Sequence, residues 1–109
     1  MAFRIVLAAA WAWGALWLGA GALAAAGPAT HTVVIESLKY VPEALAVKRG
    51  DTVVWINKDP YPHTATAKGV FDSGSIADGG SWKYTAREAG EYAYICTFHP
   101  NMKATLRVE

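Results

Sequence analysis

Turn-forming residues divide the larger part of this chain into short segments, and their spacing limits the fold more than any other feature of the sequence. Between residues 27 and 109 the turn signals recur about every eight to twelve residues. They are Gly50, Asp59–Pro60, Gly69, Gly74, Gly79–Gly80, Gly90 and Pro100. No stretch shows the sustained apolar period of about 3.6 residues that a helix requires. The pattern predicts an all-β domain, either a small antiparallel sandwich or a barrel.

The segments between these turns have the alternation of β-strands. The run DTVVWIN is apolar on both faces, which is typical of a strand in the middle of a sheet. The run KATLRVE alternates between apolar and polar residues, as a strand with one buried face does. In the run EYAYIC, the two-residue period places Tyr92, Tyr94 and Cys96 on one face. Cys96 is therefore expected to point into the domain at the far end of its strand.

Residues 1–26 differ from the rest and have the layout of an export segment. After Arg4 the sequence is uncharged up to Ala26, and small residues near its end offer cleavage sites for signal peptidase. The apolar stretch is longer than most signal-peptide cores and nearly long enough to span a bilayer. A cleaved signal peptide and a retained N-terminal membrane anchor therefore both stay open. With Arg4 in the cytoplasm, either one exports the remainder, to the periplasm or to the outer face of the cytoplasmic membrane.

Residues 27–109 form the predicted domain, and its charges balance. The chain has ten Lys and Arg and nine Asp and Glu, and removal of Arg4 leaves nine of each. This balance offers no basic surface for nucleic acid and no charged run for a membrane surface. The domain contains one cysteine and cannot form an internal disulfide. In an exported protein such a cysteine is free, paired with another chain, or used for chemistry.

The cysteine lies in the run CTFHPNM, which places a thiol, an imidazole and a thioether within seven residues. These groups belong to Cys96, His99 and Met102. Soft sulfur donors select copper(I), and imidazole accepts both copper states. A second histidine would complete a trigonal set of two histidines and one cysteine with a weak axial methionine, the arrangement of blue-copper electron-transfer sites.

Two other histidines could supply the missing ligand. His31 starts the first predicted strand, whereas His63 lies in a loop that leaves the central strand and can reach the end of the domain where Cys96 lies. We therefore choose His63. The predicted ligands of one copper ion are His63, Cys96, His99 and Met102.

The predicted ligand set fills every position around the metal with protein, which favours electron transfer over catalysis. We predict no catalytic residue, because no acid is evident that would orient Cys96 and His99 as a nucleophilic pair. The copper domain of a larger enzyme would need a second metal site, for which few histidines remain. A copper carrier or storage protein with incidental redox activity stays open as the alternative function.

Five runs of the sequence resemble the cupredoxin family: LKYVPEALAVKRGDTVVWINKD, PHT, VFDSGSI, GGSWKYT and AGEYAYICTFHPNM. The resemblance covers nearly all of residues 32–109, and the short C-x₂-H-x₂-M spacing is most similar to the amicyanin branch, whereas plastocyanins usually have a longer gap. It implies an eight-stranded Greek-key β-sandwich with one type 1 copper ion at one end. Many members have Asn after the first ligand histidine, where it ties the two ligand loops together. This chain has Thr64 there, which could form a shorter version of that bond.

The motif and the resemblance together predict a small exported blue-copper protein that carries single electrons, its copper cycling between Cu(I) and Cu(II). Its expected partners are redox proteins, a dehydrogenase or a c-type cytochrome serving as electron donor and acceptor. Nucleic acid is not an expected partner, a membrane is one only if the N-terminal segment is retained, and the protein is expected to be a monomer. Phe98, Pro100 and Pro62 are expected to surround the exposed edge of His99 with apolar surface.

Overall fold

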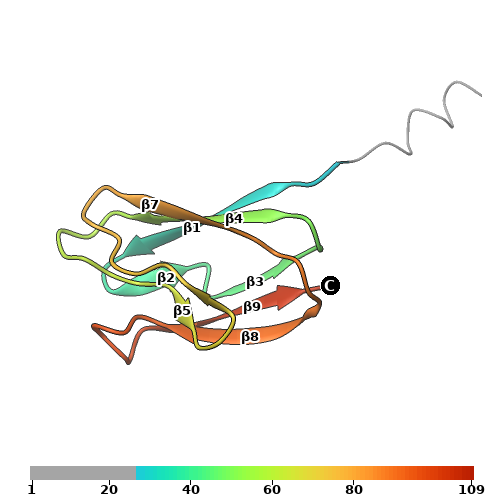
Figure 1. Ribbon diagram of the computed structural model, residues 1–109. Helices are drawn as coiled ribbons and strands as arrows, with labels where there is room; N and C mark the ends of the chain where they lie inside the picture. Colours follow the sequence, from blue (N-terminus) through green and yellow to red (C-terminus); the bar gives the residue numbers. More distant parts are fainter. Residues whose placement is uncertain (1–26) are drawn as a thin grey trace, which may run out of the picture.

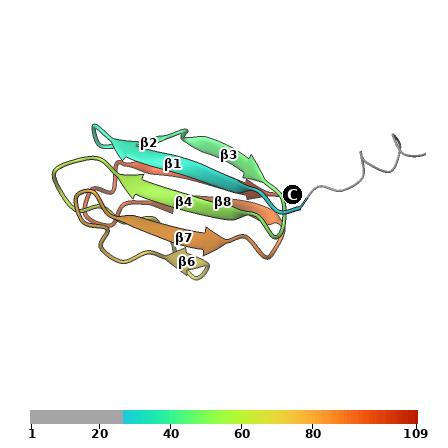
Figure 2. The ribbon, with the colours of Figure 1, turned by 90° about the horizontal axis from the view of Figure 1, so that it is seen from above.

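Figure 1 shows the computed structural model, which describes residues 27–109. Two β-sheets pack face to face, so the predicted all-β sandwich is confirmed (Figures 1 and 2). The predicted export segment, residues 1–26, lies outside the described residues and stays a prediction. In the described part of the chain, no helix is long and apolar enough to cross a membrane.

The first sheet has four strands in the order β2-β1-β4-β7, and the second has five in the order β3-β9-β8-β5-β6. The strands of the first sheet are β1 (Thr30–Glu36), β2 (Lys39–Val41), β4 (Thr52–Asn57) and β7 (Ser81–Thr85). Those of the second are β3 (Ala44–Val47), β5 (Thr66–Ala67), β6 (Phe71–Asp72), β8 (Gly90–Ile95) and β9 (Lys103–Val108). Residues 27–109 thus contain nine strands rather than the eight that the resemblance implies, because β5 and β6 are two-residue strands joined by a tight turn.

Two strand pairs are parallel, and here the prediction of an antiparallel sandwich is wrong in part. Strand β1 runs parallel to β4, and β3 runs parallel to β9. The other pairs are antiparallel. The cause is that the chain changes sheets five times, between β2 and β3, β3 and β4, β4 and β5, β6 and β7, and β7 and β8. These crossings, which give the Greek-key arrangement, place strands side by side that are not consecutive in the sequence.

The core of the sandwich is built from side chains that point inward at every second position. Strands β4 and β9 both show this alternation. Trp55 of β4 is fully buried at its centre, with ring centroids 5.5 Å from those of Phe71, Trp82 and Tyr94. Its Nε1 donates a hydrogen bond of 3.2 Å to the hydroxyl of Tyr94. This aromatic cluster joins the two sheets, so it fixes the strand ends from which the loops project.

The two ends of the sandwich carry different sets of loops. At one end, loop 58–65 leaves β4 and loop 96–102 leaves β8; we call this the ligand end, because the predicted ligands lie in these loops. At the other end, turns 48–51 and 86–89 connect strands, and β9 ends nearby; we call this the distal end. Figure 1 shows the ligand end on the left and the distal end, with the C-terminus, on the right.

Candidate metal centre

The two loops of the ligand end bring three of the predicted ligands together. Sγ of Cys96 lies 3.7 Å from Nδ1 of His63 and 3.7 Å from Nδ1 of His99. The three donor atoms all lie within 4.8 Å of one another. His63 and Cys96 are 0% exposed, whereas His99 is partly exposed. Among the residues that the structure describes, these three form the one such group of potential metal ligands.

The separations within this group fit donors that share one metal ion. If the metal–sulfur and metal–nitrogen bonds are about 2.3 and 2.0 Å, as for zinc, two such donors at about 120° lie about 3.7 Å apart. The donor set is one thiol and two imidazoles, which is the trigonal set of blue-copper sites. The chemistry and the spacing of these residues therefore both fit a copper ion.

Met102 is built into the same loop as Cys96 and His99. Its side chain is buried, and its backbone N–H donates to the carbonyl oxygen of His99 at 2.8 Å. The N–H of Cys96 donates to the carbonyl oxygen of Met102 at 3.2 Å, and the N–H of His99 donates to that of Cys96, also at 3.2 Å. The loop is therefore closed on itself by backbone hydrogen bonds, which hold the three residues in one compact turn.

A buried carboxylate holds the second ring nitrogen of His63. Nε2 of His63 lies 2.8 Å from Oδ2 of Asp59. This oxygen also accepts from the N–H of Leu38, and Oδ1 of Asp59 accepts from the N–H of Ser37. Burial alone would raise the pKa of this carboxyl group, but the hydrogen bonds from Leu38, His63 and Ser37 outweigh it and hold the pKa below its usual range. An ionised carboxylate can only accept, so in the neutral imidazole this contact favours the proton on Nε2 and leaves Nδ1, which lies beside Cys96, free to bind a metal.

The sequence analysis missed this role of Asp59, because it treated Asp59–Pro60 only as a turn signal. A carboxylate four residues before a candidate ligand histidine is the sequence signal that could have found it. From its place at the end of the central strand, Asn57 is expected to pin the turn that leads toward His63, and the structure confirms this. Its Nδ2 donates to the carbonyl oxygens of Tyr61 and Ile76 at 2.8 and 2.9 Å, and its Oδ1 accepts from the N–H of Asp59 at 2.9 Å. Asn57 thus fixes the loop that leads to His63.

Thr64 ties the two ligand loops together. Its Oγ1 accepts a hydrogen bond of 2.9 Å from the N–H of Thr97, and its own N–H donates to Sγ of Cys96 at 3.4 Å. From β2, the hydroxyl of Tyr40 donates to the carbonyl oxygen of Thr64. Burial raises the pKa of Tyr40, which keeps this hydroxyl protonated as a donor. Thr64 therefore forms the shorter bond between the loops that the sequence left open.

His31 lies at the distal end, away from the other two histidines. It pairs with Val53 near the start of β4, and its Nε2 lies 2.9 Å from Oδ2 of Asp51. The six residues of β4 span roughly 20 Å at about 3.3 Å per residue. This length separates His31 from the loop that carries His63. The ligand group accordingly contains His63 and not His31.

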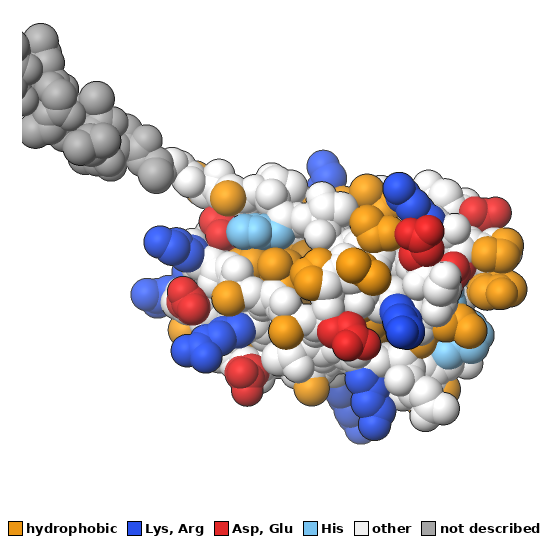
Figure 3. All heavy atoms as spheres, turned by 180° about the vertical axis from the view of Figure 1, so that it is seen from behind, with side chains coloured by type: hydrophobic (Ala, Val, Ile, Leu, Met, Phe, Trp, Pro, Cys, Tyr) orange, Lys and Arg blue, Asp and Glu red, His pale blue; other side chains and the backbone are white. Residues whose placement is uncertain are grey.

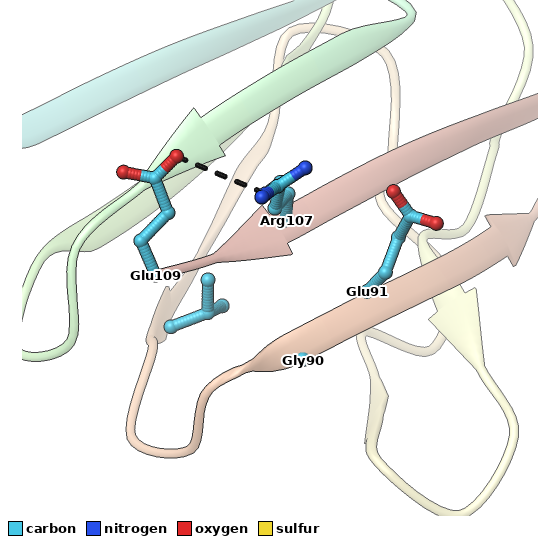
Figure 4. A pocket seen from close by; sticks show the side chains of 5 residues that line it. Gly90, Glu91, Arg107 and Glu109 are labelled. Atoms are coloured by element: carbon cyan, nitrogen blue, oxygen red, sulfur yellow. Dashed lines mark ion pairs between the residues drawn. The ribbon is translucent and has the colours of Figure 1, made fainter.

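A hollow at the distal end has a different character. Figure 4 shows it between β8 and β9, where Gly90, Glu91, Arg107 and Glu109 contribute to its lining. Nε of Arg107 lies 3.8 Å from Oε2 of Glu109, and both side chains are more than half exposed. Surface ion pairs of this kind contribute little to stability. Among the described residues, the group of potential metal ligands lies at the ligand end and not in this hollow.

Of the three residues expected around His99, Pro100 lines a hollow beside the ring, whereas Phe98 and Pro62 do not line it. Phe98 is 51% exposed, so it belongs to the surface rather than to the core, and Leu38 and Tyr61 are exposed beside the ligand loops. A shallow hollow next to the ring is lined by Leu38, His99, Pro100, Asn101 and Met102. In Figure 3, hydrophobic side chains and a histidine lie together at one end of the molecule; a second histidine lies toward the opposite end, and charged side chains are spread over the face.

Known proteins match this chain in sequence and in fold. Residues 5–108 match the family model described as the cupredoxin-like domain. Amicyanin from Paracoccus versutus is 37% identical over 89 residues, which cover 75% of this chain and 67% of that protein. The structure of the Cu(I) form of an amicyanin mutant has a TM-score of 0.69 and 36% identity, and covers 81% of this chain and 88% of that one.

A copper-containing nitrite reductase from Thermus scotoductus has a similar TM-score of 0.70, with 29% identity. The match covers 78% of this chain but only 23% of the reductase. The likeness therefore concerns one domain of a much larger protein.

Proposed function

This chain belongs to the cupredoxin family, and from this membership we propose that it is a small blue-copper protein that carries single electrons between redox partners. The observation that carries the proposal is the buried group of one thiol and two imidazoles with donor atoms 3.7 Å apart. A bound copper ion would supply a one-electron couple between Cu(I) and Cu(II).

Each proposed ligand has a distinct part. Cys96 supplies the buried thiolate, and His63 supplies Nδ1 with its other nitrogen held by a carboxylate. His99 supplies Nδ1 from the loop that reaches the surface. Met102, buried in the same closed loop, is proposed as the weak axial ligand. Because Thr64 and the loop backbone hold these residues in place, they can keep one arrangement in both oxidation states.

The partly exposed His99 is the proposed exit for the electron. Its neighbours Phe98, Leu38 and Pro100 present an apolar surface of a kind that suits brief contact with another redox protein. The balanced charge of the domain gives little long-range steering, so apolar contact would determine docking. We propose a dehydrogenase or a c-type cytochrome as donor and acceptor, with the protein acting as a monomer.

Two further properties belong to the proposal. Residues 27–109 would act outside the cytoplasm, in the periplasm, with residues 1–26 directing export or serving as an anchor. The protein would carry electrons rather than catalyse a reaction, because the proposed ligands surround the metal and leave no position for a substrate. A copper carrier or storage protein would have to release its metal readily, whereas His63 and Cys96 are fully buried.

The visible spectrum of the copper-loaded protein tests this proposal. A thiolate bound to Cu(II) gives an intense charge-transfer colour, so the oxidised protein should be blue and should bleach reversibly when it gains one electron. Cys96→Ser should remove the colour, because a serine oxygen gives no such transition. A colourless copper-loaded protein would overturn the proposal. Rapid transfer of copper to a mild chelator would instead favour a carrier or storage protein.

A further inference from the structure

We propose that Asp59 is a positioning residue of the proposed copper site and that it lowers the reduction potential by strengthening His63 as a donor. The inference rests on the proposed function, since it assigns a role to a residue behind one of the proposed ligands. It concerns the proton on Nε2 of His63 and the hydrogen bond that holds it.

The carboxylate of Asp59 is held from several sides. Its Oδ1 accepts from the N–H of Ser37 at 2.7 Å, and its Oδ2 lies 2.8 Å both from the N–H of Leu38 and from Nε2 of His63. The N–H of Asp59 itself donates to Asn57. The residue is only 5% exposed. The carboxylate therefore cannot turn toward solvent without breaking several hydrogen bonds, and its charge stays directed at the imidazole.

The turn between β1 and β2 is shaped around this carboxylate. Ser37 and Leu38 have φ values of 55° and 61°, in the left-handed region that residues other than glycine seldom adopt. Successive N–H groups in such a turn converge on one point and form a site for an anion. Here the anion is the side chain of Asp59, from a loop more than 20 residues away in the chain.

The negative charge of Asp59 changes how strongly His63 can donate electrons to a metal ion. A carboxylate that accepts the Nε2 proton draws it partly away from the ring, so Nδ1 becomes a stronger electron donor. A stronger donor favours the ion of higher charge, Cu(II), over Cu(I). The interaction is buried, where charges are screened less than in water. Asp59 is therefore expected to lower the reduction potential relative to a site with a neutral acceptor in its place.

The distal end supplies a matched control. Oδ1 of Asp51 accepts from the N–H of Ala29 at 2.9 Å, and its Oδ2 accepts from the N–H of Lys48 at 3.0 Å and lies 2.9 Å from Nε2 of His31. It thus has the same kinds of partners as Asp59, namely two backbone N–H groups and one histidine. His31 is outside the ligand group. Asp51→Asn therefore removes an equivalent set of interactions without touching a proposed ligand.

The experiment compares Asp59→Asn and Asp51→Asn in the full chain. Outer partners of ligand histidines change metal affinity by about 10-fold or more, and a tenfold change in the ratio of Cu(II) to Cu(I) affinity is about 59 mV for a one-electron couple. We expect Asp59→Asn to raise the potential by about this amount and Asp51→Asn to leave it unchanged. An unchanged potential in Asp59→Asn, or equal shifts in both variants, would overturn the inference.

Two additional measurements keep the result interpretable. In the metal-free protein, ¹⁵N NMR should show the Nε2–H tautomer of His63 in the wild type and a loss of that preference in Asp59→Asn. If Asp59→Asn fails to fold, Asp59→Glu is the second variant, because it retains a carboxylate. Its reduction potential should stay closer to the wild-type value than the rise expected for a neutral acceptor. A rise of that full size in Asp59→Glu would reject the role of the charge. If the wild type binds no copper, the proposed function fails, and the tautomer still shows whether Asp59 positions His63.

Discussion

The two ends of the sandwich contain closely similar aspartate–histidine pairs with different consequences. At the ligand end, Nε2 of His63 lies 2.8 Å from Asp59, and at the distal end, Nε2 of His31 lies 2.9 Å from Asp51. The histidine side chain is 0% exposed in the first pair and 27% exposed in the second. At the ligand end the other ring nitrogen faces a buried thiol. A histidine that contacts a carboxylate is thus a candidate metal ligand only where it is also buried beside a soft donor such as a thiol.

The surfaces of the two ends differ in the same way. Phe98 and Tyr61 of the ligand loops and Leu38 of the neighbouring turn are exposed, whereas Arg107 and Glu109 face solvent at the distal end (Figure 4). Small contact areas suit transient redox encounters, and these exposed apolar side chains offer such an area at the ligand end.

The strongest test of this contrast replaces the histidine at each end. His63→Ala should abolish the charge-transfer colour and weaken copper binding by more than about 100-fold, since loss of a ligand exceeds the loss of an outer partner. His31→Ala should leave the colour and the affinity unchanged. Visible spectra and competition with a copper chelator measure both. Equal losses in the two variants would show that the ends are not distinct.

A second test separates the tie between the ligand loops from the ligands themselves. Thr64→Val keeps the shape of the side chain but leaves the N–H of Thr97 without its acceptor, which should cost about 1–3 kcal/mol of the free energy of unfolding. Thr105→Val, on the outward face of β9, should change it by less than about 0.5 kcal/mol. Denaturant unfolding of the metal-free proteins gives both values. If Thr64→Val and Thr105→Val change the free energy of unfolding equally, the hydrogen bond between Thr64 and Thr97 does not stabilise the ligand end.

A third test places a charge on the apolar surface. Phe98→Glu should slow electron transfer to a redox partner about fivefold or more, the effect of losing about 1 kcal/mol of contact. The visible spectrum should stay the same, because Phe98 is exposed and is not a proposed ligand. Val70→Glu, at an exposed position in the turn between β5 and β6, is the control. If both variants slow transfer equally, the effect comes from charge in general and not from this surface.

The smallest expected effect is the loss of stability at low pH that Asp51, at the distal end, contributes. Hydrogen bonds from the backbone of Ala29 and Lys48 and from His31 lower the pKa of Asp51 to about 2. Because this pKa lies below that of the unfolded chain, the ionised carboxylate stabilises the fold above about pH 4, and its contribution is lost as the pH falls toward about 2. The stability difference between the wild type and Asp51→Asn should shrink over this range in urea unfolding. A difference that is constant from pH 5 to pH 2 would contradict the assignment.

Local patterns in the sequence were sufficient for the strands and for most of the candidate site. The alternation in EYAYIC placed Cys96 inward, and burial of Tyr94 and Cys96 agrees with it. The spacing within CTFHPNM and the position of His63 after a central strand brought three donors to one end. These inferences succeeded because a strand's period and a short loop act over a few residues, so the residues themselves carry the information.

The sequence alone was thus sufficient for the all-β class, the strand segments and the residues of the candidate site. Tertiary structure decided which sheet each strand joins, including the two parallel pairs, and it decided the partners of Asp59 and Thr64. Asp59 accepts a hydrogen bond from Ser37, 22 residues away in the sequence, and Thr64 accepts one from Thr97, 33 residues away. The turn at Ser37 and Leu38 contains no glycine that would mark it in the sequence, because a distant carboxylate stabilises its left-handed backbone. Contacts between residues so far apart in the sequence produce no local periodic pattern of residue types. Only the packing of the two sheets determines them.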